Sequence, residues 1–207
     1  MSDDGNAKAR RKPRADAERN RRRLLDVARV MFAENGADAS LEEIARRAEV
    51  GIGTLYRHFA TREALLAEVY RHALEQLGAA APRLLEELRP VEALKQWMRL
   101  FVDYSATKRV IAPAFQALTG GTSTLHAGAG DLLGNSINLL AERAVAAGEI
   151  HLDLAPTDLL RAVFAVTQVD DAAAGREAAF RMIDILLDGM KSRTQEPAAL
   201  ALTPSEP

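Results

Sequence analysis

Apolar residues recur along most of the chain at the three- and four-residue spacing that places them on one face of an α-helix. The first such pattern begins near residue 17 and includes Leu24, Ala28, Met31 and Phe32. Gly36 follows it and suits the left-handed position after a helix end. No stretch alternates polar and apolar residues long enough to indicate a strand. The pattern therefore predicts an all-α protein.

Two short helices and a longer one are predicted next. Ser40 and Glu43 have the spacing of a capping box, in which the serine oxygen and the glutamate carboxylate each accept a backbone N–H, and this predicts a helix over 41–48. A turn at 49–51 leads to a second short helix over 52–59. Thr61 then caps a longer helix whose apolar positions run to Leu77.

Prolines and glycines divide the remaining sequence into five further helices, expected at 91–108, 110–118, 131–147, 156–169 and 176–192. The two ends lack apolar periodicity. We expect a disordered basic arm over 1–16, one domain over 17–78, a second over 79–192 and a disordered tail over 193–207.

The glycines of the stretch Gly51-Ile52-Gly53 could belong to a loop that binds the phosphates of a nucleotide. Such loops require a lysine followed by serine or threonine, or a third glycine in a βαβ setting, and neither is present. Two short helices joined by a tight turn instead have the dimensions of a helix-turn-helix motif. Leu55 and Phe59 are expected to be buried, which leaves the following residues largely outward: Ile52, Gly53, Thr54, Tyr56, Arg57 and His58.

Charge is distributed unevenly along the 207 residues. Residues 1–60 hold 13 Lys and Arg against 10 Asp and Glu, whereas residues 61–207 hold 14 against 19. A basic segment at one end of an acidic chain indicates a polyanionic partner, although a solvated tail remains the alternative for the residues before Asp16. The absence of cysteine excludes disulfides and thiolate metal sites. We find neither a secretory signal nor a membrane-length apolar run, and we expect a cytoplasmic protein that is nucleoid-associated when bound to DNA.

Three segments together resemble the DNA-binding domain of the tetracycline-repressor (TetR) family: "RRRLLDVARVMFAENG", "SLEEIARRAEV" and "GTLYRHFATREALLAEV". The resemblance covers about Ala17 to Leu77 and implies a three-helix head that binds DNA, joined to a helical body that binds a ligand and dimerises. It places Thr54 and Tyr56 at phosphate-contacting positions, and Arg62 where the family usually has lysine.

The same resemblance implies that Ser40 caps a helix whose N-terminus faces a phosphate. It assigns base reading to Gly51, Ile52, Gly53 and Arg57. Gly51 departs from the family, which commonly has a serine or threonine cap there, and this leaves more of the reading to Ile52 and Arg57. For His58, packing against the head remains an alternative to DNA contact.

In the body, an aromatic face on the helix over 91–108 suggests either core or a ligand cavity. The candidate ligand-binding residues are Trp97, Met98, Phe101, Tyr104 and Phe115. A strongly anionic ligand is disfavoured because the body is net acidic. The last two helices are apolar around most of their circumference, which predicts a four-helix bundle with a second copy of the chain. Candidate dimer residues are Leu159, Val163, Phe164, Phe180, Ile183, Leu187 and Met190.

These features predict a homodimeric transcriptional regulator, most simply a repressor that an apolar or amphipathic small molecule releases from a roughly palindromic double-stranded DNA operator. The alternatives are a ligand-dependent activator, and a helical small-molecule-binding protein or enzyme whose head no longer binds DNA. We expect no catalytic residues, no metal and no cofactor, because no nucleophile has an activating local context and the histidines are scattered.

Overall fold

Helices make up nearly all of the chain that the computed structural model describes, which is residues 5–36, 38–119, 129–168 and 172–191, with side chains described from residue 15 onward except 110–119 and 172. The helices are α1 (Gly5–Asn35), α2 (Leu41–Arg47), α3 (Ile52–His58), α4 (Arg62–Glu87), α5 (Pro90–Thr119), α7 (Ala129–Ala146), α8 (Pro156–Val166) and α9 (Ala172–Met190). Extended pairing within these residues is limited to one bridge between Ile150 and Lys191. The all-α prediction is confirmed. None of the helices described is long and apolar enough to cross a membrane.

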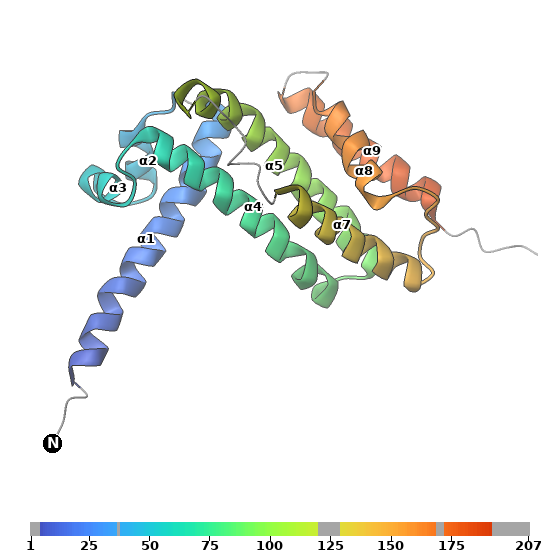
Figure 1. Cartoon of the computed structure of the whole chain (residues 1–207), viewed down its shortest axis with the longest axis horizontal. Coiled ribbons are helices and arrows are strands. Elements are labelled where there is room, and N and C mark those ends of the chain that lie inside the picture. The colour runs from blue at the N-terminus through green and yellow to red at the C-terminus, as the bar shows by residue number, and fades with distance from the viewer. Residues whose placement is uncertain (1–4, 37, 120–128, 169–171, 192–207) are drawn as a thin grey trace, which may run out of the picture.

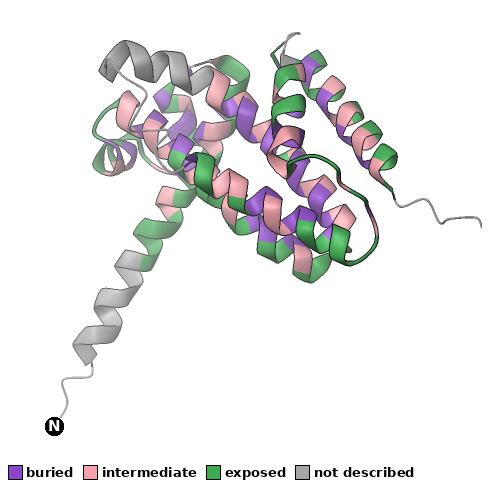
Figure 2. Ribbon diagram, turned by 45° about the vertical axis from the view of Figure 1, so that its right-hand side comes forward, coloured by how far each residue is buried: buried purple, intermediate pink, exposed green. Residues whose placement is uncertain are grey.

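The helices form a small head and a larger body (Figure 1). The head consists of α2, α3, the C-terminal part of α1 and the start of α4. In the body, α5 contacts α4 and α7 on one side and α8 and α9 on the other, so that α8 and α9 lie farthest from the head. Buried side chains line the inward faces throughout (Figure 2) and form one continuous apolar core across head and body.

Helix α4 belongs to both parts. Leu65 and Leu66 near its start are buried in the head, and Tyr70 receives a hydrogen bond of 2.7 Å from Tyr104 of α5. Further along, Gly78 lies so close to α7 that an added Cβ would stand 2.7 Å from Leu132 Cδ2. The expected domain boundary near residue 78 therefore falls inside an unbroken helix.

Two prolines that were expected to end helices lie inside them. Helix α4 continues through Pro82 to Glu87, and α5 runs from Pro90 through Pro113 as one helix, where two were expected. A proline inside a helix removes one backbone hydrogen bond and costs about 3 kcal/mol. Around Pro82, burial of Ala80, Ala81 and Leu84 against the body offsets that cost. Tertiary packing thus overrides the local signal.

Helix α1 also begins earlier than expected, at Gly5 instead of about residue 17, so that most of the arm expected to be disordered is helical. It projects from the head in Figure 1. This segment is rich in alanine, lysine and arginine, which have high intrinsic helix propensity. A search for apolar periodicity detects only helices that bury a face, and it therefore missed this one.

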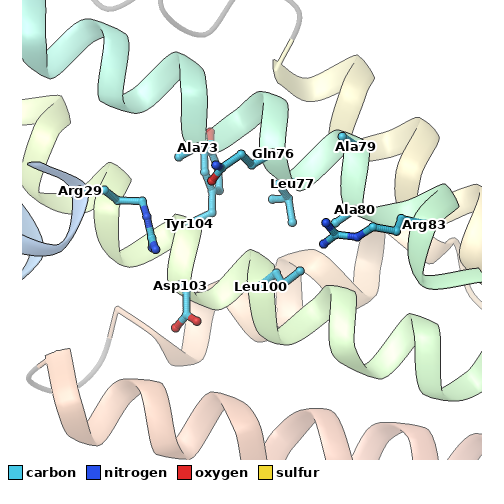
Figure 3. A pocket seen from close by; sticks show the side chains of 10 residues that line it. All are labelled: Arg29, Ala73, Gln76, Leu77, Ala79, Ala80, Arg83, Leu100, Asp103 and Tyr104. Carbon is cyan, nitrogen blue, oxygen red and sulfur yellow. The ribbon is translucent and has the colours of Figure 1, made fainter. Parts of the chain in front are cut away.

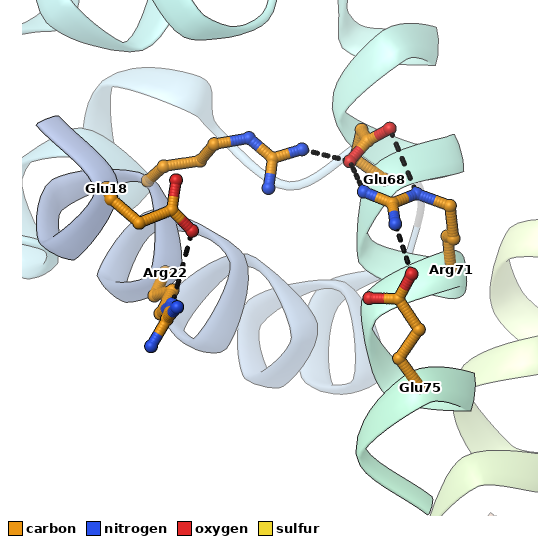
Figure 4. A network of polar contacts seen from close by, with 6 residues as sticks. Glu18, Arg22, Glu68, Arg71 and Glu75 are labelled. Atoms are coloured by element: carbon orange, nitrogen blue, oxygen red, sulfur yellow. Dashed lines mark hydrogen bonds and ion pairs between the residues drawn. The ribbon is translucent and has the colours of Figure 1, made fainter. Parts of the chain in front are cut away.

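A network of charged side chains joins α1 to α4 (Figure 4). Arg21 of α1 pairs with Glu68 of α4, and Arg71 donates to the same carboxylate at 2.6 Å. Hydrogen bonding from Arg71, with a smaller contribution from Arg21, lowers the pKa of Glu68 below its ordinary value. Arg21 also lies over the ring of Phe59, 5.6 Å from its centroid. One arginine thus connects α1, α4 and the end of α3.

Trp97 is the largest side chain in the core and fixes the contact between α4 and α5. It is fully buried, and its indole N–H donates to the carbonyl of Leu77 at 2.8 Å. Its ring stacks on Phe101 with 6.2 Å between centroids.

We expect Trp97→Phe to lower the free energy of unfolding by about 2 kcal/mol, because it removes a buried hydrogen bond worth about 1 kcal/mol and leaves a space where the larger ring was. Urea denaturation followed by circular dichroism measures this change. Tyr56→Phe, at an exposed position, is the control and should change stability by less than about 0.5 kcal/mol. A Trp97→Phe variant as stable as the unmodified chain would contradict the role given to the indole.

Candidate functional site

Helices α2 and α3 are joined by a tight turn. Val50 donates its backbone N–H to the carbonyl of Ala45 at 3.0 Å, and Glu49 adopts a positive φ of 55°. That conformation is uncommon for a residue other than glycine, and here it reverses the chain within a few residues. Ile44, Ala45 and Leu55 are buried on the facing sides of the two helices. The arrangement is a helix-turn-helix, as the sequence predicted.

The N-terminus of α2 is capped by Ser40, whose Oγ accepts from the Glu43 backbone N–H at 3.2 Å. The expected return bond from Glu43 to the Ser40 backbone does not form. The Glu43 carboxylate instead accepts from Arg46 at 2.6 Å and from Arg47 at 2.9 Å. These two hydrogen bonds, that from Arg46 first, lower the pKa of Glu43 to about 2. Long basic side chains of the same helix thus compete successfully for the carboxylate.

Helix α3 buries one side and exposes the other. Leu55 and Phe59 are buried in the head, whereas Ile52, Tyr56 and Arg57 are exposed. Within the described chain, Arg57 has no ion-pair partner, so its charge is not neutralised by a neighbouring carboxylate. The outward face therefore offers a phenol, a guanidinium and an apolar side chain to a groove lined by phosphates.

Thr54 and His58 are less exposed than the other predicted contact residues of α3. Both are half-buried, and the His58 ring lies 6.1 Å from the Phe59 ring in a tilted arrangement. This contact gives His58 a packing role in the head, the alternative that the sequence left open.

The two glycines at the start of α3 are not required by the fold. Gly51 has φ −71°, and an added Cβ on either Gly51 or Gly53 would meet no atom within 4 Å. Both residues are exposed. Glycine inside a helix costs about 0.5–1 kcal/mol relative to alanine, so the bare surface at Gly53 calls for a reason outside the folded chain, whereas Gly51 is the N-cap, where glycine is common. Close approach of another molecule to the backbone supplies such a reason.

Arg62 has a structural contact that the sequence did not reveal. It is the first residue of α4, and its guanidinium donates to the carbonyl of Ala39 at 2.6 Å. Ala39 directly precedes the Ser40 cap, so Arg62 holds the start of α2 against the start of α4. Replacing Arg62 by alanine would remove both its positive charge and this hydrogen bond. Only the loss of the charge bears on phosphate binding.

Most of the candidate ligand-binding residues lie in the core. Trp97 and Met98 are fully buried, and the indole N–H is already engaged by Leu77, so it is not available to a ligand. The side chain of Phe115 lies outside the described residues. Phe101 and Tyr104 are each 6% exposed, and burial raises the pKa of Tyr104 well above its ordinary value.

Tyr104 does line a cavity of about 390 Å³ between α1, α4 and α5 (Figure 3). Its other borders come from residues that sequence reasoning did not select, and they are Arg29, Ala73, Gln76, Leu77, Ala79, Ala80, Arg83, Leu100 and Asp103. Had α4 been extended past Pro82, its positions 73, 76, 80 and 83 would have shown a common helical face. The expected break concealed that pattern.

Several candidate dimer residues are buried within the chain itself. Leu159, Val163, Ile183 and Leu187 are at most 3% exposed, so the side chains of their own chain already cover them. Helical periodicity shows that a side chain is buried but not against which neighbour. Three others keep partial exposure, namely Phe164, Phe180 and Met190. On α9 the outward position is Ile185, which is 64% exposed.

Comparisons with known proteins agree with this geometry. Residues 24–69 match the family described as bacterial regulatory proteins, tetR family, and residues 89–192 match the C-terminal domain described as transcriptional regulator SbtR-like. The structure is similar to that of the TetR transcriptional regulator SCO0520 from Streptomyces coelicolor, with 40% identity, a TM-score of 0.75 and coverage of 83% of this chain and 98% of that one.

A TetR regulatory protein from Mycobacterium vanbaalenii is similar at 31% identity with a TM-score of 0.70, over 86% of this chain and 99% of that one. The curated relative UidR of Escherichia coli (strain K12), an HTH-type transcriptional regulator, is 36% identical over 90 residues. That match spans 43% of this chain and 40% of the relative.

We expect Gly53→Ala to stabilise the folded chain by about 0.5–1 kcal/mol while weakening its binding to operator DNA about tenfold or more. The methyl group improves helix propensity and meets nothing in the free protein, but it would be crowded by a close-lying DNA backbone. Thermal denaturation and a DNA-binding titration measure the two effects.

The matched control is Gly134→Ala inside α7, where the new Cβ meets only Thr157 at 4.0 Å. It should raise stability by a similar amount and leave DNA binding unchanged. Equal DNA affinity for Gly53→Ala and the unmodified chain would show that no backbone approaches Gly53.

Proposed function

Since the chain belongs to the TetR family of bacterial regulatory proteins, we propose that this transcriptional regulator is a homodimeric repressor that a small molecule releases from its operator. The observation that carries the proposal is the exposed face of α3, with two glycines that the fold does not need and an arginine without an ion-pair partner among the described residues. Such a protein acts at the nucleoid, in the cytoplasm.

In this proposal each head places α3 in a major groove. Thr54, Tyr56 and Arg62 contact phosphates, the N-terminus of α2 capped by Ser40 faces another, and Ile52 and Arg57 read base edges, with Gly51 and Gly53 permitting close approach. Two heads related by a twofold axis require a roughly palindromic operator, with half-sites about 34–36 Å apart or a multiple of that spacing.

Release follows when the effector binds better to a body conformation in which the two heads are wrongly spaced. The loss of DNA affinity then equals the difference in effector affinity between the two conformations, typically about 1–3 kcal/mol. Helix α4 provides the physical connection, because it starts beside α3 and lines the cavity further along.

Dimerisation is proposed through the outer faces of α8 and α9. These helices lie on the side of the body away from the head, and Ile185 there is the most exposed large apolar side chain in the described part of the chain. Phe164, Phe180 and Met190 are partly exposed residues of the same two helices, although Phe164 and Phe180 also contact α5, since Lys108 lies over the first ring and Arg99 over the second. A twofold contact would cover this surface with its own copy.

The DNA-reading role is tested with Arg57→Gln. An arginine that contacts a guanine edge contributes about 1–3 kcal/mol of discrimination, so the variant should lose roughly ten- to hundredfold affinity for the operator while its affinity for random DNA changes much less. The operator is first obtained by selecting genomic fragments with the purified protein. Arg143→Gln removes an equal charge from the exposed surface of α7 and should bind both DNAs normally.

If Arg57→Gln loses the same factor on operator and random DNA, Arg57 touches only the backbone. If the unmodified chain selects no fragment and binds random DNA without salt dependence, the head does not bind DNA and the proposed function is wrong.

The dimer is tested with Ile185→Arg, which should give soluble monomers because it replaces an exposed apolar side chain of the proposed contact by a charge that the contact would have to desolvate. Leu88→Arg, at another exposed apolar position near the far end of α4, is the control and should remain dimeric. Sedimentation velocity distinguishes the two states. Leu187→Glu should instead destabilise the fold of each chain, since Leu187 is only 3% exposed within it. An Ile185→Arg protein that sediments as a dimer would place the interface elsewhere.

A further inference from the structure

The cavity beside Tyr104 lies at the junction of head and body. Arg29 reaches it from α1, whose neighbouring residues Ala28 and Met31 are buried in the head core, and the remaining lining comes from α4 and α5. Its volume of about 390 Å³ falls within the range of pockets that bind small molecules, roughly 300–1,000 Å³.

Two cationic side chains border this cavity without a carboxylate partner in the part of the chain that is described, and these are Arg29 and Arg83. The one acidic side chain of the lining, Asp103, is already paired with Arg176 of α9 at 2.7 Å. The lining therefore carries an excess of positive charge. Most other arginines of the described chain, such as Arg71 and Arg99, have an acidic neighbour within ion-pair distance.

Arg29 also holds an unused hydrogen-bond donor. Its Nε is buried and has no hydrogen-bond partner within the described structure. A buried donor without an acceptor costs free energy that a bound acceptor would recover. Guanidinium groups bind carboxylate and phosphate oxygens through two parallel N–H groups, which makes an anionic oxygen the natural partner for the guanidinium of Arg29.

The middle of the cavity is largely apolar, although Gln76 and Tyr104 also line it. Figure 3 shows Arg29 and Arg83 at opposite ends, both extending toward the middle, where Leu77 and Leu100 lie. Between Ala73 and Ala80 the α4 backbone advances by roughly 10 Å at 1.5 Å per residue. An apolar chain or ring system of that length fits the middle, with an acidic group at an arginine.

We propose that the cavity binds an amphipathic anion, with a carboxylate or phosphate held by Arg29 and an apolar part against Leu77 and Leu100, while Arg83 adds positive charge at the opposite end. This names the chemical class of the effector and to that extent rests on the proposed function. It also replaces the sequence-based expectation that an anionic ligand is disfavoured, because that expectation counted only the charges of the body. Arg29 comes from the head.

The position of Arg29 gives the ligand a means of acting on the head. An anion that binds Arg29 of α1 also contacts residues of α4 and α5. It therefore links the part of α1 that belongs to the head to the middle of the body. Binding then favours whichever head orientation brings Arg29 closest to the anion.

The test measures binding of three probes with the same ten-carbon chain to the full-length protein by isothermal titration calorimetry, namely decanoate, decyl phosphate and decanol. We expect at least one anion to bind about tenfold or more tightly than decanol. The better of the two anions identifies the acidic group as carboxylate or phosphate. Arg29→Gln should weaken the anion about ten- to hundredfold, and Arg83→Gln should weaken it by a smaller factor, because its charge lies farther from the acidic group.

Arg29→Lys keeps the charge but lacks the two parallel N–H groups of the guanidinium, so it should also bind the anion more weakly than the unmodified chain. Arg143→Gln, an exposed arginine on α7, is the control and should bind it normally. Circular dichroism checks that each variant is folded, and the exposed position of Arg83 keeps the test decisive should Arg29 variants misfold.

Decanol binding as tightly as both anions, or normal anion binding by both glutamine variants, would overturn the proposal. Operator binding by the unmodified protein is measured separately. A protein that binds its operator but no anion retains the proposed function without this pocket chemistry, whereas arginine-dependent anion binding without any DNA binding would overturn the proposed function alone.

Discussion

The unbroken course of α4 from Arg62 to Glu87 is the constraint on which the rest of the structure depends. Its first turns complete the head core with Leu65 and Leu66, and its later turns receive the indole N–H of Trp97 at Leu77. A helix that passes through one continuous core cannot tilt at one end without moving the other, because packed interiors shift between discrete arrangements. The orientation of α3 is therefore tied to the packing of the body.

The exposed face of α3 contains residues that contribute little to the fold of the free chain. Gly53 weakens α3 slightly, and neither it nor Gly51 relieves crowding in the free chain, while Arg57 is left without an acidic partner in the described structure. Nearby, Arg46 and Arg47 are both held by Glu43. The charge on the exposed face is thus concentrated on α3 instead of being spread over both helices, which suits a helix that enters a groove while its partner supports it.

The sequence predicted those features that local chemistry determines. The cap at Ser40, the turn after α2 and the buried pair Leu55 and Phe59 each depend on residues within a few positions of one another, and the structure contains all three. The helix end expected at Pro82 is absent, because burial by distant elements outweighs the loss of one hydrogen bond. Contacts between residues that are far apart in the sequence could not be predicted in this way.

The cavity and the proposed dimer surface both depend on contacts between residues far apart in the sequence. Arg29 and Arg83 are far apart in the chain and become neighbours of one cavity only when α1 and α5 both pack on α4. Likewise, the periodicity of α9 identified Ile183 and Leu187 as buried but could not say that their own chain covers them, leaving Ile185 as the outward position. The contact of Arg62 with the Ala39 carbonyl is another product of the fold that no motif contains.

The most direct test of the account measures the distance between the two heads. The chain has no cysteine, so Ala33→Cys on the exposed side of α1 introduces a single spin label per chain, and pulsed electron paramagnetic resonance then reports the label-to-label distance in the proposed dimer. If α4 holds each head on the body, the protein without DNA gives a defined distribution of label-to-label distances. Operator DNA should narrow this distribution to one distance compatible with recognition helices about 34–36 Å apart or a multiple of that spacing. A broad distribution that operator DNA leaves unchanged would contradict the account, because the heads would then be neither held by the body nor fixed by DNA.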